Sequence, residues 1–353
     1  MKKKKLIWVT NVPSPYRLPI FEELAKTYDL DVFYLQANDV DRGWVIDRTS
    51  SYRSFQLPVW RIRIFGRKTE VLRGSARDTL KKYDCIVVGG WDSIAYLQLI
   101  RWASKNSKLH LFYESTLSSH RFKKGPIAWL RKKALSSASE VITPGIESTE
   151  AVKIATQGKT IVRQSFNPID VEFFKPTQEN KNSAQGHKFL YVGRFIPLKN
   201  IDALILAFDK IASEQDTLTI VGYGDEIDNL KSLAAKVKNH KQIFFEPKVE
   251  YSNLPALYSR HHTQVLPSKE KEVWGMVVAE ALSMGLHSVV SSQCGILASL
   301  SEVPGVFGFD PALEGDLQAA LMSSKKQWAG TLAGSEIRSL ANPTKFVRGI
   351  HLC

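Results

Sequence analysis

The sequence predicts an α/β protein built from two tandem doubly wound domains with a cleft between them. Short β-branched or aromatic segments alternate with helix-length amphipathic segments, which is typical of a parallel sheet covered by helices on both faces. This alternation stops near residues 167–187 and then restarts. The length of 353 residues also exceeds what one core usually supports. Together these observations favour a tandem of two domains.

The amino-terminal domain is predicted to span residues 1–166. Its strands are expected at 6–10, 30–35, 85–90, 109–115, 141–145 and 160–166. Amphipathic helices are expected around 18–28, 93–105, 126–138 and 146–157. Because the strands are mostly apolar and alternate with helices, we expect a parallel sheet that is buried on both faces.

A polar segment, residues 167–187, is predicted to link the two domains. The carboxy-terminal domain is predicted to span residues 188–335. Its strands are expected at 188–194, 218–224, 243–247, 263–268 and 287–292. Because the strand and helix rhythm restarts here, a second Rossmann-like domain is the natural interpretation.

Positive charge is concentrated in the first half of the chain, and the formal net charge is +13. Residues 1–170 contain 29 Lys and Arg against 16 Asp and Glu, whereas residues 171–353 contain 19 of each. This asymmetry points to an anionic partner for the first half, which is membrane lipid, nucleic acid or a phosphorylated substrate. We do not expect nucleic acid, because the sequence lacks the interleaved aromatic and basic residues that single-strand binders use.

The composition, with 44% hydrophobic and 24% charged residues, is that of a soluble globular protein. The sequence contains no apolar segment long enough to span a bilayer. The basic start, Lys2 to Lys5, is followed only by LIWV, which is too short for the core of a signal peptide. Cys85, Cys294 and Cys353 lie far apart, without metal-ligand spacing. We therefore expect a reduced, cytoplasmic setting.

The turns after the strands of the second half are candidate ligand sites, because doubly wound domains bind ligands beyond the carboxyl ends of their strands. The first turn begins with Gly193, which allows a close bend, and places Arg194 and Lys199 near a helix start. Two cations there suit a pyrophosphate, although solvated basic residues at a helix entrance are the plainer alternative. The second turn contains Gly222 and Gly224 but lacks the third glycine of a dinucleotide fingerprint.

Two glutamates flank an apolar segment later in the chain, with Glu272 in a loop and Glu280 in the following helix. The first amides of that helix, at Gly275, Met276 and Val277, are free to bind an anion. A helix turns by about 100° per residue, so eight residues bring Glu280 to within about a quarter turn of the direction in which Glu272 points. Glu280 then lies roughly two turns further along the helix. One carboxylate can thus reach a sugar hydroxyl while the other accepts ribose hydroxyls. The plainer alternative is a solvated loop residue and a polar helix residue.

Three segments of this half carry a family resemblance, in the order YVGRFIPLKNIDALILAF, LTIVGYGDEIDNLKSLA and LPSKEKEVWGMVVAEALSMG. They resemble the donor half of family 4 retaining glycosyltransferases of the GT-B fold, which are glycosyl transferases of group 1. The resemblance is strong from residue 188 to about residue 295 and extends weakly through NVPSPYRLPIFEEL, NPIDVEFF and FVRGI. Each motif alone is weak, whereas the ordered series is specific.

The resemblance implies roles for the matching residues. Arg194 and Lys199 match the basic pair that holds the donor diphosphate, with the amides of residues 275–277 beside them. Glu272 matches the glutamate placed at the donor sugar, and Glu280 matches the one that binds the nucleotide ribose. The donor would be a UDP or GDP sugar, the anomeric configuration would be retained, and neither metal nor cofactor would be needed. The remaining donor-side candidates are Gly193, Gly222 and Gly224.

The resemblance places the acceptor on the amino-terminal domain. Tyr16 and Arg17 could line the acceptor side, although a helix entrance shaped by proline is an equal alternative. Glu114 and His120 are candidates for contact with the transferred sugar or for acid-base chemistry, and solvated loop residues are the plainer alternative. The last residues, 336–353, would form a helix that crosses back onto this domain.

Basic and apolar residues are mixed in residues 120–135, a pattern that can lie in a membrane interface with its cations on the headgroups. A core helix with a solvated basic face is an equal alternative. The charge excess of the presumed acceptor domain favours the membrane, as expected for a lipid-linked acceptor. The residues predicted to face the membrane are Lys123, Lys124, Trp129, Arg131, Lys132 and Lys133.

These predictions combine into a retaining, metal-independent glycosyltransferase that acts on a cell-envelope polysaccharide or a lipid-linked acceptor. We expect it in the cytoplasm, peripherally attached to the inner face of the cytoplasmic membrane. A nucleotide-sugar epimerase or a phosphorylase of the GT-B fold is the alternative, and it would need no basic membrane face. A basic nucleic-acid-binding protein would explain the charge alone.

Overall fold

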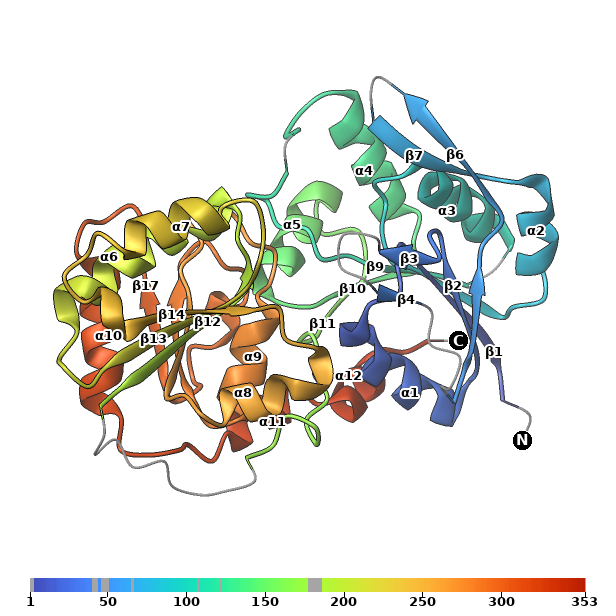
Figure 1. Ribbon diagram of the computed structural model, residues 1–353. Helices are drawn as coiled ribbons and strands as arrows, with labels where there is room; N and C mark the ends of the chain where they lie inside the picture. The colour runs from blue at the N-terminus through green and yellow to red at the C-terminus, as the bar shows by residue number, and fades with distance from the viewer. Residues whose placement is uncertain are drawn as a thin grey trace. The chain divides into compact units, whose positions relative to one another are not determined.

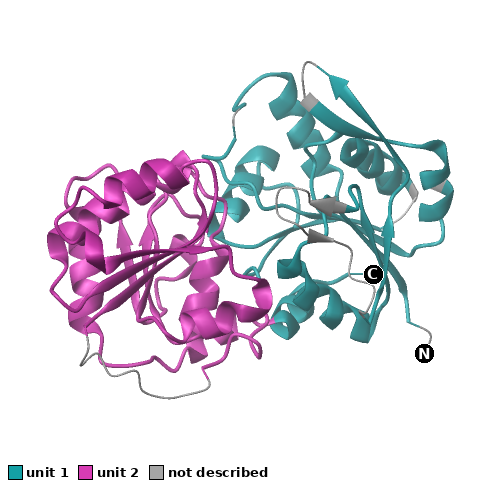
Figure 2. Cartoon of the chain, in the orientation of Figure 1, with its two compact units in different colours: residues 1–168, 343–353 teal, residues 169–342 magenta. Residues whose placement is uncertain are grey.

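The computed structural model describes residues 3–39, 44–45, 51–64, 67–106, 108–120, 122–176 and 186–352. The chain forms two compact units, which are coloured separately in Figure 2. Unit 1 consists of Met1–Pro168 and Pro343–Cys353, and unit 2 consists of Ile169–Asn342. Each unit contains a parallel sheet of its own, as Figure 1 shows.

The sheet of unit 1 is built around β1, where the strand order reverses. The chain extends the sheet from β1 through β2 and β5 on one side, and through β8, β9, β10 and β11 on the other. The strands are β1 (Lys5–Thr10), β2 (Asp29–Tyr34), β5 (Arg53–Gln56), β8 (Cys85–Val88), β9 (Lys108–Phe112), β10 (Glu140–Thr143) and β11 (Val162–Gln164).

Helices cover both faces of this sheet because the side chains of β1 alternate between two cores. Leu6 and Trp8 belong to the core that α1 and α12 cover, whereas Ile7 and Val9 belong to the core that α2, α3, α4 and α5 cover. The helices are α1 (Leu18–Thr27), α2 (Gly74–Leu80), α3 (Ile94–Asn106), α4 (Pro126–Ser136), α5 (Ile146–Thr156) and α12 (Pro343–Gly349). The doubly wound arrangement predicted for the first half is confirmed.

Unit 1 also contains antiparallel strand pairs for which no strands were predicted. β6 (Val59–Ile64) and β7 (Arg67–Leu72) form a hairpin, and β3 (Asn38–Asp39) pairs with β4 (Trp44–Val45). β7 packs against α3, as Figure 1 shows. β6 is largely exposed, so the hairpin adds little to the cores described above.

The sheet of unit 2 is built around β12 in the same way. Its order is β14, β13, β12, β15, β16, β17, so the strand order reverses between β12 and β15. Phe189 and Tyr191 of β12 belong to a core with α6, α7 and α10, whereas α9 packs against β15 and β16 and contacts α11. The strands are β12 (Lys188–Arg194), β13 (Thr217–Tyr223), β14 (Ile243–Pro247), β15 (Thr263–Leu266), β16 (His287–Ser291) and β17 (Val306–Phe309). The helices are α6 (Ile201–Ile211), α7 (Ile227–Ala234), α8 (Leu254–Tyr258), α9 (Met276–Ser283), α10 (Asp316–Gln327) and α11 (Ser335–Leu340).

The end of the chain differs from the single helix expected over residues 336–353. It contains α11 in unit 2 and α12 in unit 1. α12 starts at Pro343, which lacks a backbone N–H and therefore suits the first turn of a new helix rather than the interior of a continuous one. Phe346 of α12 is buried in the same core as Trp8 and Phe21, which anchors this end of the chain to unit 1.

The segment expected as a linker, residues 167–187, is only partly described, because residues 177–185 lie outside the described residues. Before that gap, Ile169, Val171 and Phe174 are buried. These apolar side chains make the start of the segment part of a core rather than a solvated connection. In the described part of the chain, no helix has the length and apolar character needed to cross a membrane.

Candidate functional site

The reversal of strand order in unit 2 brings together two loops that carry predicted site residues. One loop follows β12 and contains Arg194 and Lys199, and the other follows β15 and contains Ser268 and Glu272. β12 and β15 are neighbours in the parallel sheet, so the two loops leave the same edge. Ligands of doubly wound sheets bind at this position, which makes it the candidate site.

Lys199 and Glu272 form an ion pair at this edge. Their side chains are 11% and 19% exposed, and the Lys199 Nζ to Glu272 Oε1 distance is 2.6 Å. The Ser268 hydroxyl donates a hydrogen bond of 2.7 Å to the other carboxylate oxygen of Glu272. The Glu272 amide donates to the Gln293 carbonyl at 2.9 Å, and its carbonyl accepts from the Gly295 amide at 3.0 Å. Both backbone and side chain of Glu272 are therefore held in place.

Arg194 lies at the end of β12 with an exposed side chain. Its carbonyl accepts a hydrogen bond of 2.9 Å from the hydroxyl of Tyr191, and burial raises the pKa of Tyr191 well above its ordinary value. A Cβ on Gly193 would lie 2.7 Å from that hydroxyl. Because Gly193 has no side chain, the uncharged Tyr191 hydroxyl has room at this position and holds the backbone of Arg194 in place.

Gly222 and Gly224 have a structural explanation in the turn after β13. Their φ angles are 151° and 149°, which side chains rarely adopt. A Cβ would lie 1.8 Å from the Gly193 carbonyl oxygen at Gly222, and 2.3 Å from the Phe195 carbonyl oxygen at Gly224. The two glycines thus let this turn lie directly against the end of β12. Their contact with a donor remains a prediction.

The start of α9 lies between Glu272 and Glu280 in the sequence. Gly275, at φ 109°, precedes the helix, and a Cβ there would lie 2.7 Å from Leu266 Cδ2. Among the described residues, no side chain caps this helix start. The amides of the half-buried Met276 and Val277 precede the first hydrogen bond of the helix, which the Val278 amide donates to the Gly275 carbonyl, and they can bind an anion.

Glu280 is fully buried in α9, which the sequence analysis did not anticipate. The Tyr258 hydroxyl donates a hydrogen bond of 2.8 Å to its Oε2, and in the described part of the chain Oε1 has no partner. Burial raises the pKa of Glu280 to about 7, and the hydrogen bond from Tyr258 acts in the opposite direction. Tyr258 and Ser268 are contacts that the sequence analysis missed.

Arg17 and Glu114 meet at the carboxyl edge of the sheet of unit 1, after β1 and β9. Their side chains form an ion pair, and the Arg17 guanidinium lies 4.2 Å from the centroid of the Phe112 ring. Asn167 donates a hydrogen bond of 3.3 Å to the second oxygen of Glu114. Tyr16 is half-buried beside Arg17 in the sequence. The structure therefore brings Arg17, a candidate for the acceptor side, into direct contact with Glu114, a candidate for the sugar contact or acid-base chemistry.

His120 is buried rather than solvated. Its Nε2 lies 2.5 Å from the Tyr113 hydroxyl. Burial, together with the smaller effect of the Arg131 charge, lowers the pKa of His120 to about 4. The imidazole is therefore uncharged at neutral pH. A role for it in acid-base chemistry remains a prediction.

The prediction that Arg131 faces a membrane is wrong. Arg131 is 6% exposed, and its guanidinium lies 5.5 Å from the centroid of the Trp91 ring. The reason is its place on α4, since Ala134 and Leu135, three and four residues later, are buried on the same face of the helix.

The rest of the basic stretch is at the surface. Trp129 is 58% exposed, the Lys133 amine lies 4.9 Å from the centroid of its ring, and Ile127 and Leu130 are also exposed. The predicted lysines are exposed as well, namely Lys123, Lys124, Lys132 and Lys133. Arg121 lies outside the described residues. α4 and the segment before it therefore carry both apolar and cationic side chains that are exposed.

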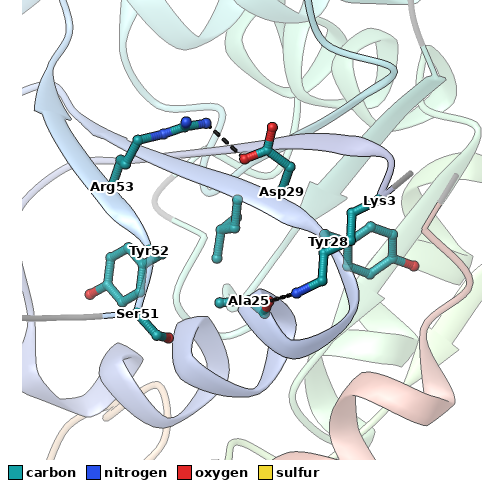
Figure 3. Close-up of a pocket in the computed structure, with 8 residues that line it drawn as sticks. Lys3, Ala25, Tyr28, Asp29, Ser51, Tyr52 and Arg53 are labelled. Atoms are coloured by element: carbon teal, nitrogen blue, oxygen red, sulfur yellow. Dashed lines mark hydrogen bonds and ion pairs between the residues drawn. The ribbon is translucent and has the colours of Figure 1, made fainter. Parts of the chain in front are cut away.

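A hollow of about 410 Å³ in unit 1, drawn in Figure 3, lies at the opposite edge of the sheet from Arg17 and Glu114. It is lined by Lys3, Asp29 and Arg53, which precede or begin β1, β2 and β5. Arg53 and Asp29 pair there at 2.8 Å, so the charges of the hollow are partly neutralised within it. Among the described residues, no group of His, Cys, Asp and Glu side chains could hold a metal ion.

Residues 174–303, which include the candidate-site residues of unit 2, match the sequence model of a family described as Glycosyl transferases group 1. This part of the chain is therefore similar to the glycosyl transferases group 1 family, in agreement with the resemblance that the sequence predicted. A similar sequence is an uncharacterized glycosyltransferase of Methanocaldococcus jannaschii, 25% identical over 158 residues. That match spans 43% of this chain and 37% of the relative.

Solved structures show that this chain has the predicted GT-B fold. The Anabaena protein HepE in complex with UDP has a TM-score of 0.76 and 16% identity, covering 98% of this chain and 97% of that chain. The lipopolysaccharide outer core galactosyltransferase WaaB has a TM-score of 0.70 and 12% identity, covering 97% of each chain. WaaG, a glycosyltransferase of lipopolysaccharide biosynthesis, has a TM-score of 0.63 and 14% identity, covering 98% of this chain and 95% of that chain.

Proposed function

We propose that this chain transfers a sugar from a nucleoside-diphosphate sugar, with retention of the anomeric configuration and without a metal. The observation that carries the proposal is the Lys199–Glu272 pair at the strand reversal of unit 2, beside an exposed Arg194. Cations and helix amides at such an edge suit a diphosphate, and a fixed carboxylate suits a sugar hydroxyl. HepE in complex with UDP-glucose, with a TM-score of 0.67, supports a uridine nucleotide as the first donor to test.

Lys199 can serve the donor without releasing Glu272. An ammonium group has three donor hydrogens, and the pair with Glu272 uses one of them. A diphosphate oxygen of the donor can accept a hydrogen bond from a second hydrogen of this ammonium group. Lys199 would then place its positive charge beside the leaving group while it still holds the Glu272 carboxylate in place. Charge develops on the departing diphosphate in the transition state, where such a cation stabilises it most.

The test is a panel of UDP and GDP sugars, scored by thermal stabilisation and by release of the nucleoside diphosphate. We expect one nucleotide series to stabilise the chain and Lys199→Ala to lower the rate of release by roughly a hundredfold. Lys269→Ala is the matched control, because Lys269 is an exposed cation in the loop that carries Glu272. A chain that no sugar nucleotide stabilises would contradict the proposal. A changed sugar without acceptor would favour an epimerase, and transfer to or from inorganic phosphate would favour a phosphorylase.

For the acceptor, we propose a glycan or lipid-linked acceptor at an anionic membrane surface. The exposed lysines and Trp129 of the α4 region support this, together with the charge excess of residues 1–170. Each Lys or Arg near an anionic surface contributes about 1 kcal/mol, so four lysines suffice for reversible binding that salt weakens. WaaB and WaaG are lipopolysaccharide glycosyltransferases, which is consistent with this class of acceptor.

Co-sedimentation with liposomes that contain anionic lipid tests the membrane proposal. We expect binding at low salt, and its loss when Lys123, Lys124, Lys132 and Lys133 are replaced by glutamine. The matched control replaces four exposed lysines of unit 2 by glutamine, namely Lys231, Lys236, Lys238 and Lys241. Wild-type protein that stays in the supernatant would leave a soluble acceptor as the better interpretation. Equal loss in both variants would show unspecific charge attraction.

A further inference from the structure

The carboxylate of Glu280 is buried, and among the described residues one of its two oxygens has no hydrogen-bond partner. Its side chain is fully buried, Oε2 accepts the hydrogen bond from Tyr258, and among the described residues Oε1 accepts none. A buried carboxylate oxygen without a donor is unfavourable, and such atoms are rare in folded proteins. A hydroxyl of a bound ligand is the kind of group that would satisfy it.

Tyr258 is itself firmly held. It is fully buried, and its ring lies 6.1 Å from Phe174 in an edge-to-face contact. Phe174 also meets Tyr251 edge to face at 5.6 Å, and Phe173 stacks on Tyr251 at 5.4 Å. The Ser283 hydroxyl of α9 donates a hydrogen bond of 2.5 Å to the Phe174 carbonyl. The helix that carries Glu280 is thus tied to the aromatic cluster that holds the Tyr258 hydroxyl.

The aromatic cluster also reaches the surface. Phe173 and Tyr251 are half-buried, and Tyr251 follows β14 at the carboxyl edge of the sheet. This is the edge at which Lys199 and Glu272 lie.

We propose that Tyr258 is a positioning residue, which occupies one oxygen of Glu280 and leaves the other available to the ribose hydroxyls of the donor. This inference rests on the proposed function, since it concerns the nucleotide of the same donor. Tyr258 acts in two ways. Its hydroxyl fixes the rotamer of the carboxylate, and it stabilises the ionised form that accepts hydrogen bonds best. The pair therefore selects ribonucleotides over nucleotides that lack the ribose hydroxyls.

The experiment compares the affinities of UDP and 2′,3′-dideoxy-UDP by calorimetry, and of GDP and its dideoxy analogue if the guanine series binds. A hydrogen bond to a charged group changes affinity by about tenfold or more. We expect wild type to prefer UDP by at least about tenfold, and Tyr258→Phe to lose most of this preference by weakening UDP alone. Glu280→Met, which removes the acceptor, should lose it entirely.

A double variant separates positioning from packing. If Tyr258 acts through Glu280, adding Tyr258→Phe to Glu280→Met should have no further effect on UDP binding. The matched control is Tyr83→Phe, because Tyr83 is a buried tyrosine in unit 1 whose hydroxyl also donates to a carboxylate, that of Asp31. It should lower the thermal midpoint and leave the preference for UDP unchanged.

The outcomes distinguish the inference from the function on which it rests. If wild type prefers UDP and a folded Tyr258→Phe variant keeps that preference, the inference is overturned and the proposed function stands. Equal weakening of UDP and its dideoxy analogue by Tyr258→Phe would also overturn it, because a packing defect acts on both. If wild type binds neither nucleotide series, the proposed function fails and the inference fails with it.

Discussion

Replacing Lys199 by alanine removes one half of the ion pair at the candidate site. The Lys199 and Glu272 side chains are 11% and 19% exposed, so the pair lies between the buried and the exposed cases. Breaking a buried pair by removing one partner destabilises a protein by about 3 to 5 kcal/mol, whereas an exposed pair contributes about 0 to 1 kcal/mol. Ser268 would still donate to Glu272 in the variant. We therefore expect the free energy of unfolding to fall by about 1 to 2 kcal/mol.

The effect on turnover should be larger than the effect on stability. Loss of one charge-assisted contact to a developing diphosphate raises the barrier by about 3 kcal/mol, which is roughly a hundredfold in kcat. Urea denaturation measures the first quantity, and release of the nucleoside diphosphate measures the second. Lys269→Ala should change neither. A folded Lys199→Ala variant with kcat within about threefold of wild type would refute a diphosphate contact at this residue.

Three further predictions follow from other parts of unit 2. Glu280→Ala should weaken nucleotide binding, whereas Glu272→Ala should mainly lower turnover; unchanged affinity and turnover in both variants would contradict their assignment. Gly222→Ala should lower the thermal midpoint by several degrees, because its Cβ would lie 1.8 Å from the Gly193 carbonyl oxygen; an unchanged midpoint would show that this turn can move away. Burial, with the charge of His262 adding to it, lowers the pKa of His187 to about 3. Below about pH 6.5, His187 is therefore protonated in the unfolded chain but stays neutral in the folded chain. The free energy of unfolding should fall by up to about 1.4 kcal/mol per pH unit as the pH drops from about 6.5 towards 4. Urea midpoints across this range should fall less steeply in His187→Gln, and an identical slope would contradict the buried, neutral imidazole.

The strands of both sheets other than β5 and β17 could be predicted from the sequence, because buried parallel strands are mostly apolar. β1 and β12 are such strands, with almost every residue buried or half-buried. β6 was not predicted, since arginines alternate with its apolar residues and its side chains are largely exposed. β17 was missed as well, and it is a short edge strand that contains a glycine.

The candidate site was predictable only where its residues lie in recognisable turns. Lys199 and Glu272 were placed at one edge because each follows a strand, but their direct pairing depends on the strand order. Tyr258 could not be found, because its contact with Glu280 joins two helices through tertiary packing. Arg131 was misplaced because its charge alone suggested exposure, whereas its helix face is set by Ala134 and Leu135.

The most direct test of the central claim is calorimetric titration of UDP and of GDP into the wild-type chain and into an Arg194→Ala/Lys199→Ala variant. The claim is that unit 2 binds a nucleoside diphosphate at the strand reversal between β12 and β15. It predicts that one nucleotide binds the wild type with little sensitivity to moderate salt, and binds the folded variant at least about a hundredfold more weakly. Binding that is unchanged in the variant, or a wild-type chain that binds neither nucleotide, would contradict it.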